Sequence, residues 1–412
     1  MNFLGKLFIV FCLFPYIRIL PINIDAQPNA LILGTLIIAI TKPIKVKKYI
    51  FDLLLVLVFA IILMILTSPN INGIRILSNY FSLFIISFAT YLVLTDLRRI
   101  PYNLFVYIVY IWGIVGLIQL FYPTFLSFLT LRGAYGGPTY GRGVSSLAVE
   151  PTFYGMICVF LMMINYINFR NMPKYKFTKL VCIIQLIFFS RSTTCFMALI
   201  LAFCCYAAYK IVTSRSGLKI VGLSVITLLL GHHLLHIYVG FSDSRFSNVL
   251  QAIFSDPSTF LTIDYSVNHR FTHAFLTIKG FFDNFFIPHG FNDFSLYLER
   301  LLKDPFWSNT IVIDPKIEER ITTSLGGTLF ELGLLSTPLF MALFGSLKKL
   351  TLSGYNGVLI GLILLSMMMN AMNFNQAILP FFIGNLIYLK YQQPSTSNPT
   401  TSSILPSYNK LN

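Results

Sequence analysis

Apolar runs separated by short polar turns repeat along almost the whole chain. Runs of about 17 to 25 apolar residues are long enough to cross a hydrocarbon core of about 30 Å as an α-helix. The pattern predicts twelve membrane helices, at residues 3–20, 28–41, 50–67, 74–95, 102–122, 149–167, 178–190, 194–212, 218–239, 328–345, 354–373 and 376–390. Eleven to thirteen helices stay open, because one run is short and two others meet at a tight turn. The expected fold is an all-α, polytopic bundle of membrane helices.

Two long polar segments interrupt the apolar runs, and a third ends the chain. The predicted membrane domain covers residues 1–391 and includes two long loops, at about 123–148 and 240–327. Residues 392–412 are rich in Ser, Thr, Pro and Asn, a composition that buries too little apolar surface to fold. The sequence therefore predicts one membrane domain followed by a disordered tail.

Lys and Arg are divided unevenly between the two sides of this predicted bundle. Most of the 30 basic residues fall in segments on one side, as at Lys42, Lys174 and Lys348. Because positively charged loops near helix ends remain in the cytoplasm, this side is predicted to be cytoplasmic. Both termini are then inside, and the two long loops are outside.

The composition excludes several classes of protein. Of the 412 residues, 56% are hydrophobic and only 11% are charged, which excludes an ordinary soluble domain. The net charge of +15 is explained by inner loops that face anionic membrane lipid, and no folded basic domain is predicted that would bind nucleic acid. The six cysteines lie in apolar runs and are interpreted as packing residues.

Arginine is the only basic residue in the short outer loops, at Arg18, Arg75, Arg132, Arg142 and Arg191. Its planar fork of donors suits bidentate contact with phosphate or carboxylate better than the point charge of lysine does. The outer surface is therefore a candidate site for an anionic substrate. The only acidic residue of the first outer loop, Asp25, is interpreted as a turn residue.

Glu150 and Pro151 begin the sixth predicted helix. Proline is tolerated in the first turn of a helix, and a carboxylate there is stabilised by the helix dipole. One interpretation is a favourable helix start in which Glu150 pairs with a nearby arginine. The other is a functional pair, in which Arg142 and Glu150 act together at the membrane surface.

The run Arg142-Gly-Val-Ser-Ser-Leu-Ala-Val-Glu-Pro-Thr-Phe-Tyr-Gly155 resembles the signature of the Wzy-type O-antigen and capsular polysaccharide polymerases, which are relatives of the O-antigen ligases. Thr152 stands where that family usually has serine and keeps the hydroxyl. Further segments that resemble parts of the same family are Ser190-Arg-Ser-Thr-Thr194, Asn268-His-Arg-Phe-Thr-His273, Asn284-Phe-Phe-Ile-Pro-His-Gly-Phe-Asn292 and Gly326-Gly-Thr-Leu-Phe-Glu-Leu-Gly-Leu-Leu335.

The resemblance implies a GT-C-like bundle in the bacterial inner membrane with its active face in the periplasm. The implied activity is that of a metal-independent, inverting-type glycosyltransferase without a cofactor. Such an enzyme polymerises oligosaccharide repeat units carried on undecaprenyl diphosphate, in the biosynthesis of lipopolysaccharide or a related polysaccharide. Its partners are the polyprenyl-diphosphate-linked oligosaccharide and membrane lipid. A chain-length regulator protein is a further partner that the sequence leaves open.

The resemblance also implies roles for outer residues. The catalytic set is Glu150, His289, Arg142 and Arg270, and the substrate-binding set is Arg132, Arg191, His269, His273 and Tyr140. The arginines are expected to hold the diphosphate and to stabilise it as it leaves. The acceptor hydroxyl needs a base, for which Glu150 and the outer histidines are the candidates. Glu150 has two other roles open to it, which are to orient Arg142 or to bind a sugar hydroxyl.

Several alternatives stay open beside the polymerase. An O-antigen ligase shares the donor but transfers the polymer to a lipid A core. A lipid-linked sugar flippase or another transporter is expected to carry charged residues along its mid-membrane helices, whereas the apolar runs here are nearly free of charge. A third alternative is a scaffold protein whose arginines pair only with its own acids. His232, His233 and His236 have a spacing that can ligate a metal, although packing at the membrane interface is the favoured interpretation.

Overall fold

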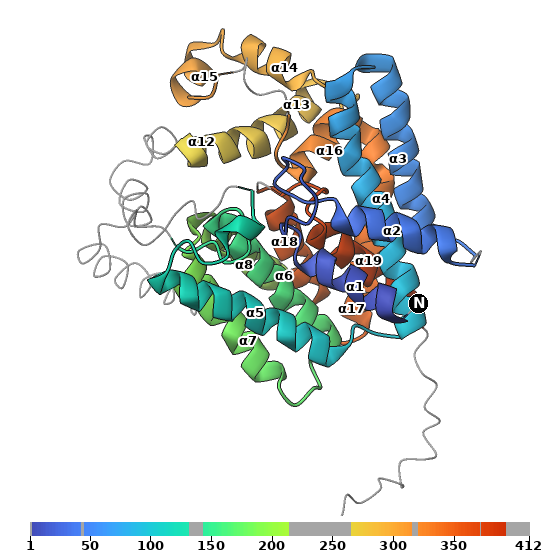
Figure 1. The fold of residues 1–412 in the computed structure, drawn as a ribbon. Coiled ribbons are helices and arrows are strands. Elements are labelled where there is room, and N and C mark those ends of the chain that lie inside the picture. The colour runs from blue at the N-terminus through green and yellow to red at the C-terminus, as the bar shows by residue number, and fades with distance from the viewer. Residues whose placement is uncertain are drawn as a thin grey trace, which may run out of the picture.

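A computed structural model describes residues 2–42, 45–131, 143–213, 265–314, 320–370 and 372–392, and these residues form helices and turns without a strand (Figure 1). The helices of the first half are α1 (Asn2–Leu13), α2 (Asn29–Ile40), α3 (Lys48–Thr67), α4 (Ile71–Leu97), α5 (Tyr102–Phe121), α6 (Pro151–Phe169), α7 (Tyr175–Ile184) and α8 (Thr193–Thr213). Those of the second half are α12 (Tyr265–Phe271), α13 (Thr277–Asp283), α14 (Phe294–Leu301), α15 (Pro305–Thr310), α16 (Ser324–Leu332), α17 (Thr337–Leu352), α18 (Gly357–Met368) and α19 (Ile378–Tyr391). The predicted all-α class is confirmed.

Within the described residues, 6 helical segments are long and apolar enough to cross a membrane. They are α3, α4, α5, α6, α8 and the continuous stretch of α16 and α17. The shorter apolar helices α1, α2, α18 and α19 occur along the chain in the order that the hydropathy predicts. The predicted helix at 218–239 lies outside the described residues. These helices support the prediction of a helical membrane protein. The count of twelve spans and the GT-C-like arrangement stay predictions.

Two predicted helices differ most from the structure in their bounds. The first was expected over 3–20 but ends at Leu13, because Pro15 has no N–H to donate and disfavours helical backbone at the residue before it. The helix expected over 328–345 begins earlier, at Ser324, and is interrupted at Gly333. Gly333 has a φ of +53°, and a Cβ there would lie 2.4 Å from the carbonyl oxygen of Phe286. Close backbone packing therefore breaks this helix.

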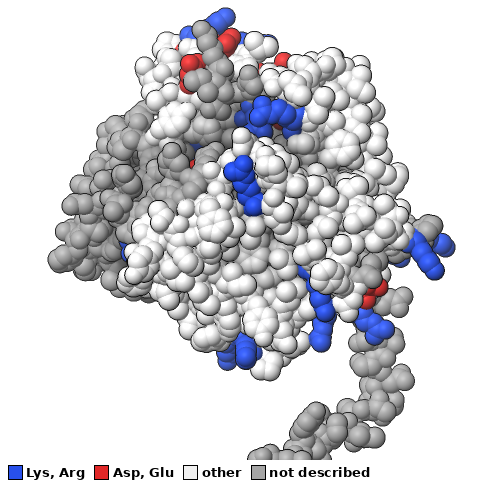
Figure 2. Space-filling view, viewed as in Figure 1, with Lys and Arg blue, Asp and Glu red and all other residues white. Residues whose placement is uncertain are grey.

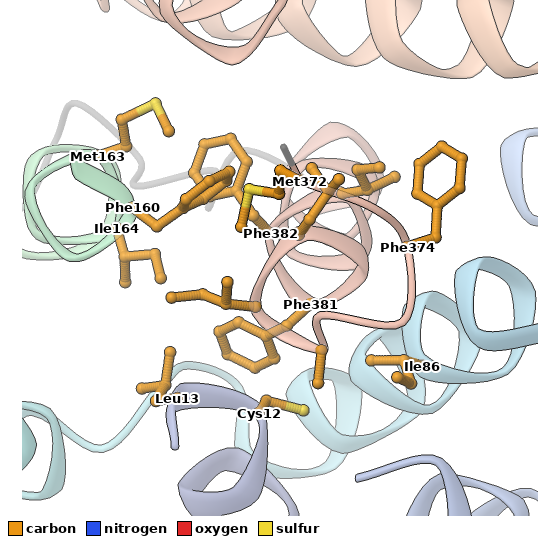
Figure 3. Close-up of a cluster of buried hydrophobic side chains, with 14 of the residues drawn as sticks. Cys12, Leu13, Ile86, Phe160, Met163, Ile164, Met372, Phe374, Phe381 and Phe382 are labelled. Carbon is orange, nitrogen blue, oxygen red and sulfur yellow. The ribbon is translucent and has the colours of Figure 1, made fainter. Parts of the chain in front are cut away.

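The core lies where the first, fourth, sixth and last of these helices meet. Figure 3 shows Leu13 of α1, Ile86 of α4, Phe160 of α6, and Phe381 and Phe382 of α19 within one buried cluster. The rings of Phe160 and Phe382 meet edge to face with their centroids 5.5 Å apart. Segments from both ends of the chain thus close the bundle around one apolar interior.

Helix α4 packs against α2, α3 and α19. Its contact with α19 depends on Gly384, because a Cβ there would lie 2.5 Å from the carbonyl oxygen of Ser87. The hydroxyl of Ser87 donates to the carbonyl of Pro380 over 2.9 Å. Small residues of this kind allow two membrane helices to approach closely, since apolar side chains gain little from leaving lipid.

Segments that the charge pattern places in the cytoplasm contact one another. Lys47 lies over the ring of Tyr391 at 5.7 Å, and Lys390 lies over the ring of Tyr49 at 5.8 Å. The backbone N–H of Tyr49 also donates to the hydroxyl of Tyr391 over 3.3 Å. Figure 2 shows Lys and Arg along the lower edge of the molecule, other charged side chains near its top, and a broad surface with few charges between them.

Segments that the charge pattern places outside also contact one another. The backbone N–H of Arg18 donates to the carbonyl of Leu129 over 2.8 Å, which joins the first outer loop to the loop after α5. The N–H of Val144 donates to the carbonyl of Phe189 over 2.8 Å, which joins the end of that loop to the last helical turn (Gln185–Ser190) before α8. Such contacts are expected of segments that share one side of a membrane.

The described part of the predicted outer loop at 240–327 is folded rather than irregular. It forms α12 to α15 and the start of α16 (Figure 1). Leu276, Phe294 and Leu298 are fully or almost fully buried and form a small second core with Phe330 of α16. The described part of the predicted loop therefore carries helices, because its apolar side chains pack into a small core together with Phe330 of α16. This helical cap positions one arginine of the candidate site.

Candidate functional site

Hydrogen bonds of Ser146 hold the segment that leads into helix α6. Ser146 adopts a left-handed conformation with a φ of 52°. Its N–H donates to the side chain of Gln119 over 2.6 Å, and its hydroxyl donates to the carbonyl of Trp112 over 2.8 Å. Glu150 is the extended residue at the N-cap position, and Pro151 occupies the first helical position, where its missing N–H costs little. The two residues noted in the sequence therefore do begin a helix.

Helix α8 begins beside the same point. The hydroxyl of Ser192 accepts from the N–H of Cys195 over 3.3 Å and so caps the helix. Gly155 of α6 packs directly against this turn, because a Cβ there would lie 2.9 Å from the sulfur of Cys195 and 3.0 Å from the hydroxyl oxygen of Ser190. The thiol of Cys195 also contacts the carbonyl oxygen of Thr152, 3.5 Å away. The N-termini of α6 and α8 are therefore neighbours.

Arg270 of α12 joins these two helix starts. Its Nη2 donates to the hydroxyl of Thr152 over 3.3 Å, and its Nη1 donates to the hydroxyl of Thr194. The side chain is partly buried. A helix N-terminus presents N–H groups and a partial positive charge. Two such termini beside a guanidinium form a concentration of positive potential that is suited to a bound anion.

Tyr16 lies beside the start of α6, although it is far from α6 in the sequence. Only 1% of its surface is exposed, and its ring centroid is 5.6 Å from that of Phe153. Burial raises the pKa of Tyr16, and the negative charges of Asp25 and Glu150 raise this pKa further. Two outer-loop carboxyl groups therefore lie within electrostatic range of one buried phenol at the edge of the arginine site.

The sequence pattern does not predict three of these residues as part of the site. It predicts Tyr16 inside the first helix, Asp25 as a turn residue and Thr194 only as part of a joining turn. The proline at position 15 was the available signal, because it ends α1 and makes the next residue part of an outer turn.

His273 and His269 lie on the same stretch of chain as Arg270. His273 is fully buried, with its ring centroid 4.2 Å from that of His269 and 5.1 Å from that of Phe294. Its Nδ1 accepts from the N–H of Thr322 over 3.3 Å. The contacts of His273 thus hold α12 against the segment before α16. The substrate-binding role of these two histidines stays a prediction.

His289 is held within the cap. Its Nε2 is 3.0 Å from the carbonyl oxygen of Gly280, and its ring stacks on Phe330 with the centroids 4.0 Å apart. The backbone N–H of His289 donates to the carbonyl of Phe330 over 3.1 Å. The next residue, Gly290, has a φ of +80°. These contacts favour a structural role for His289, and its role as a base stays a prediction.

We expect His289→Ala to lower the free energy of unfolding by about 1–3 kcal/mol, through loss of the aromatic stack and the hydrogen bond. We also expect this variant to retain its activity at a temperature where it stays folded. Thermal unfolding of the purified protein and an activity assay below the midpoint check both parts. A variant that keeps wild-type stability but is inactive would instead support a catalytic histidine.

Glu331, from the last segment that carries the resemblance, ties the cap to the bundle. The hydroxyl of Tyr80 on α4 donates to its Oε2 over 2.5 Å, and its backbone carbonyl accepts from the N–H of Gly290 over 3.1 Å. Its side chain is only 7% exposed. Glu331 therefore connects α16 to α4 through its carboxyl and to the turn that follows His289 through its backbone carbonyl.

Of the remaining predicted residues, one lies in the turn before α8, and the others lie outside the described residues. Arg191 is exposed, has a φ of 43° and donates through Nε to the carbonyl of Phe188 over 3.2 Å. The others, which the structure does not describe, are Arg132, Tyr140, Arg142, His232, His233 and His236. Among the described residues, no group of three or more His, Cys, Asp or Glu side chains is placed to hold a metal ion.

Comparison of the chain with protein-family models, with curated proteins and with solved structures gave no match. The resemblance to the Wzy-type polymerases therefore rests on the quoted segments of the sequence.

Proposed function

We propose that the chain is a membrane glycosyltransferase that joins polyprenyl-diphosphate-linked oligosaccharide repeat units into O-antigen or a related surface polysaccharide. It acts at the periplasmic face of the bacterial inner membrane. The observation that carries the proposal is the position of Arg270 between the hydroxyls of Thr152 and Thr194. Arg270, Thr152 and Thr194 belong to three separate segments, each of which resembles part of the polymerase family.

The chemistry of the donor fits this arrangement. A polyprenyl diphosphate places two phosphates at the membrane surface, with the sugar chain beyond them. Arg270 and the starts of α6 and α8 bind the diphosphate and stabilise the charge that develops as it leaves. Diphosphate is a good leaving group, so arginine charge takes the part that a divalent metal plays in other transferases.

The transfer step moves one sugar chain between two carriers. An acceptor hydroxyl oxygen attacks the anomeric carbon of the donor and forms the new glycosidic bond, while the bond from that carbon to the diphosphate breaks. The proton of the hydroxyl passes to a base, and the electron pair leaves with the diphosphate. We assign the base to Glu150. This partly buried carboxyl directly precedes Pro151 and Thr152 in the chain, and the hydroxyl of Thr152 accepts a hydrogen bond from Arg270.

Two other functions share part of these features. An O-antigen ligase uses the same donor, so the same arginine site serves it equally well. A flippase is favoured by one observation, which is the buried pair of Glu331 and Tyr80 between α16 and α4. An ionisable residue inside a membrane span is often functional. This pair, however, also has a structural part, because it joins α16 to α4 beside the point where the backbone carbonyl of Glu331 holds the turn at Gly290.

Deletion of the gene in its own host is expected to reduce the ladder of surface glycolipid to core carrying a single repeat unit. The physical reason is that each further repeat requires a transfer between two lipid carriers. Gel electrophoresis of the surface glycolipid checks this, with the wild-type gene supplied on a plasmid as the control.

The other two outcomes separate the alternatives. Loss of every repeat from the core, with long chains kept on the carrier lipid, indicates a ligase. Repeat units trapped on the inner leaflet, shown by their resistance to a saccharide-modifying reagent added to intact spheroplasts, indicate a flippase.

A further inference from the structure

The hydroxyl of Tyr16 is an unusual buried polar group. The side chain is 1% exposed, and its hydroxyl has no hydrogen-bond partner in the described part of the chain. Most buried polar side-chain atoms are hydrogen-bonded, because leaving one without a partner costs about 1–3 kcal/mol. A buried hydroxyl without a partner beside a candidate site therefore needs an explanation.

The backbone around Tyr16 is held on both sides. The carbonyl of Pro15 accepts from the N–H of Gln27 over 2.8 Å, and the N–H of Arg18 donates to the carbonyl of Leu129 over 2.8 Å. The side chain of Asn29 donates to the carbonyl of Ile17 over 2.9 Å. These bonds surround Tyr16 on the chain, so its side chain is presented from a fixed turn.

The surroundings of Tyr16 suit a saccharide. Its ring lies 5.6 Å from that of Phe153, in the first turn of α6, and the charges of Asp25 and Glu150 act on it. The phenol is a hydrogen-bond donor, and its raised pKa keeps it protonated at neutral pH. The carboxyl groups of Asp25 and Glu150 add oxygens of the kind that accept hydrogen bonds from sugar hydroxyls. Donor, acceptors and an aromatic ring together match a polyhydroxylated ligand.

We propose that Tyr16 donates a hydrogen bond to a hydroxyl of the saccharide that binds beside Glu150, in a sugar subsite next to the diphosphate site at Arg270. This inference rests on the proposed function, and it assigns the turn after α1 to substrate recognition. The diphosphate binds at Arg270 and the starts of α6 and α8. The sugar binds at Tyr16 and at the carboxyl groups of Asp25 and Glu150.

The test is Tyr16→Phe in the full-length protein, purified in lipid nanodiscs. Without substrate, the melting temperature is expected to be unchanged or higher, because the substitution removes a buried hydroxyl that has no partner. With lipid-linked oligosaccharide extracted from the gene-deleted host, the KM is expected to rise about 10-fold, as for the loss of one hydrogen bond in the complex. A purely structural residue would change the melting temperature without this change in KM.

Tyr102→Phe is the matched control. The hydroxyl of Tyr102 is also buried without a hydrogen-bond partner among the described residues, but it lies at the start of α5, on the predicted cytoplasmic side. This variant is expected to keep the wild-type KM. A Tyr16→Phe variant with wild-type KM and kcat overturns the sugar subsite and leaves the proposed function standing. A wild-type protein that does not elongate the extracted substrate removes the proposed function, and the subsite with it.

Discussion

Replacement of Arg270 by alanine is expected to slow chain elongation by about 10²–10³-fold, the usual cost of removing one group that stabilises developing negative charge. Arg270 lies between the hydroxyls of Thr152 and Thr194, where the starts of α6 and α8 add positive potential. Loss of the guanidinium therefore removes the positive charge that joins the two helix starts. Elongation of extracted lipid-linked oligosaccharide by purified protein is the measurement.

Two further variants separate charge from geometry at this position. Arg270→Lys keeps the positive charge but offers no planar fork that reaches two hydroxyls, so its activity is expected to lie between those of the alanine variant and the wild type. Arg300→Ala is the control, because Arg300 is an exposed arginine of the same cap on α14. Wild-type activity in Arg270→Ala, with a wild-type melting temperature, would remove Arg270 from the site.

Gly326→Ala is expected to lower activity by about 10²-fold, whereas Gly327→Ala is expected to be neutral or stabilising. A Cβ at Gly326 would lie 2.2 Å from the hydroxyl oxygen of Thr277 and 2.7 Å from the carbonyl oxygen of His273. It would push the cap away from α16, and with it Arg270, which lies one helical turn before His273. A displacement of about 1 Å at a catalytic group is enough for a loss of this size.

The neighbouring glycine is a control in the same helix. A Cβ at Gly327 would meet nothing closer than 3.5 Å, which is ordinary contact, and alanine is favoured over glycine in a helix by about 1 kcal/mol. Thermal unfolding and elongation assays of both variants give the comparison. The Gly326 variant is also expected to lose about 1–3 kcal/mol of stability through overpacking. Equal behaviour of the two variants would show that the approach of the cap to α16 does not position Arg270.

The sequence by itself determined the class of the protein and the order of its helices. The apolar runs predicted α3, α4, α5, α6 and α8 to within a few residues, because a span of the membrane requires a long apolar stretch that is visible locally. Lys and Arg predicted which turns share a side, and the described turns of each side do contact one another. The helix start at Glu150 and Pro151 was also predictable, since capping preferences act over one turn.

Only the tertiary structure decided which outer residues meet. Arg270 reaches Thr152 and Thr194, which are 118 and 76 residues away in the chain, and no local pattern encodes such a distance. Hydropathy could not place Tyr16 either, because its apolar ring suits the interior of a helix as well as a buried turn. The described part of the long outer segment folds for the same reason: its core includes Phe330 from α16, so its structure depends on a contact made only after the chain has come together.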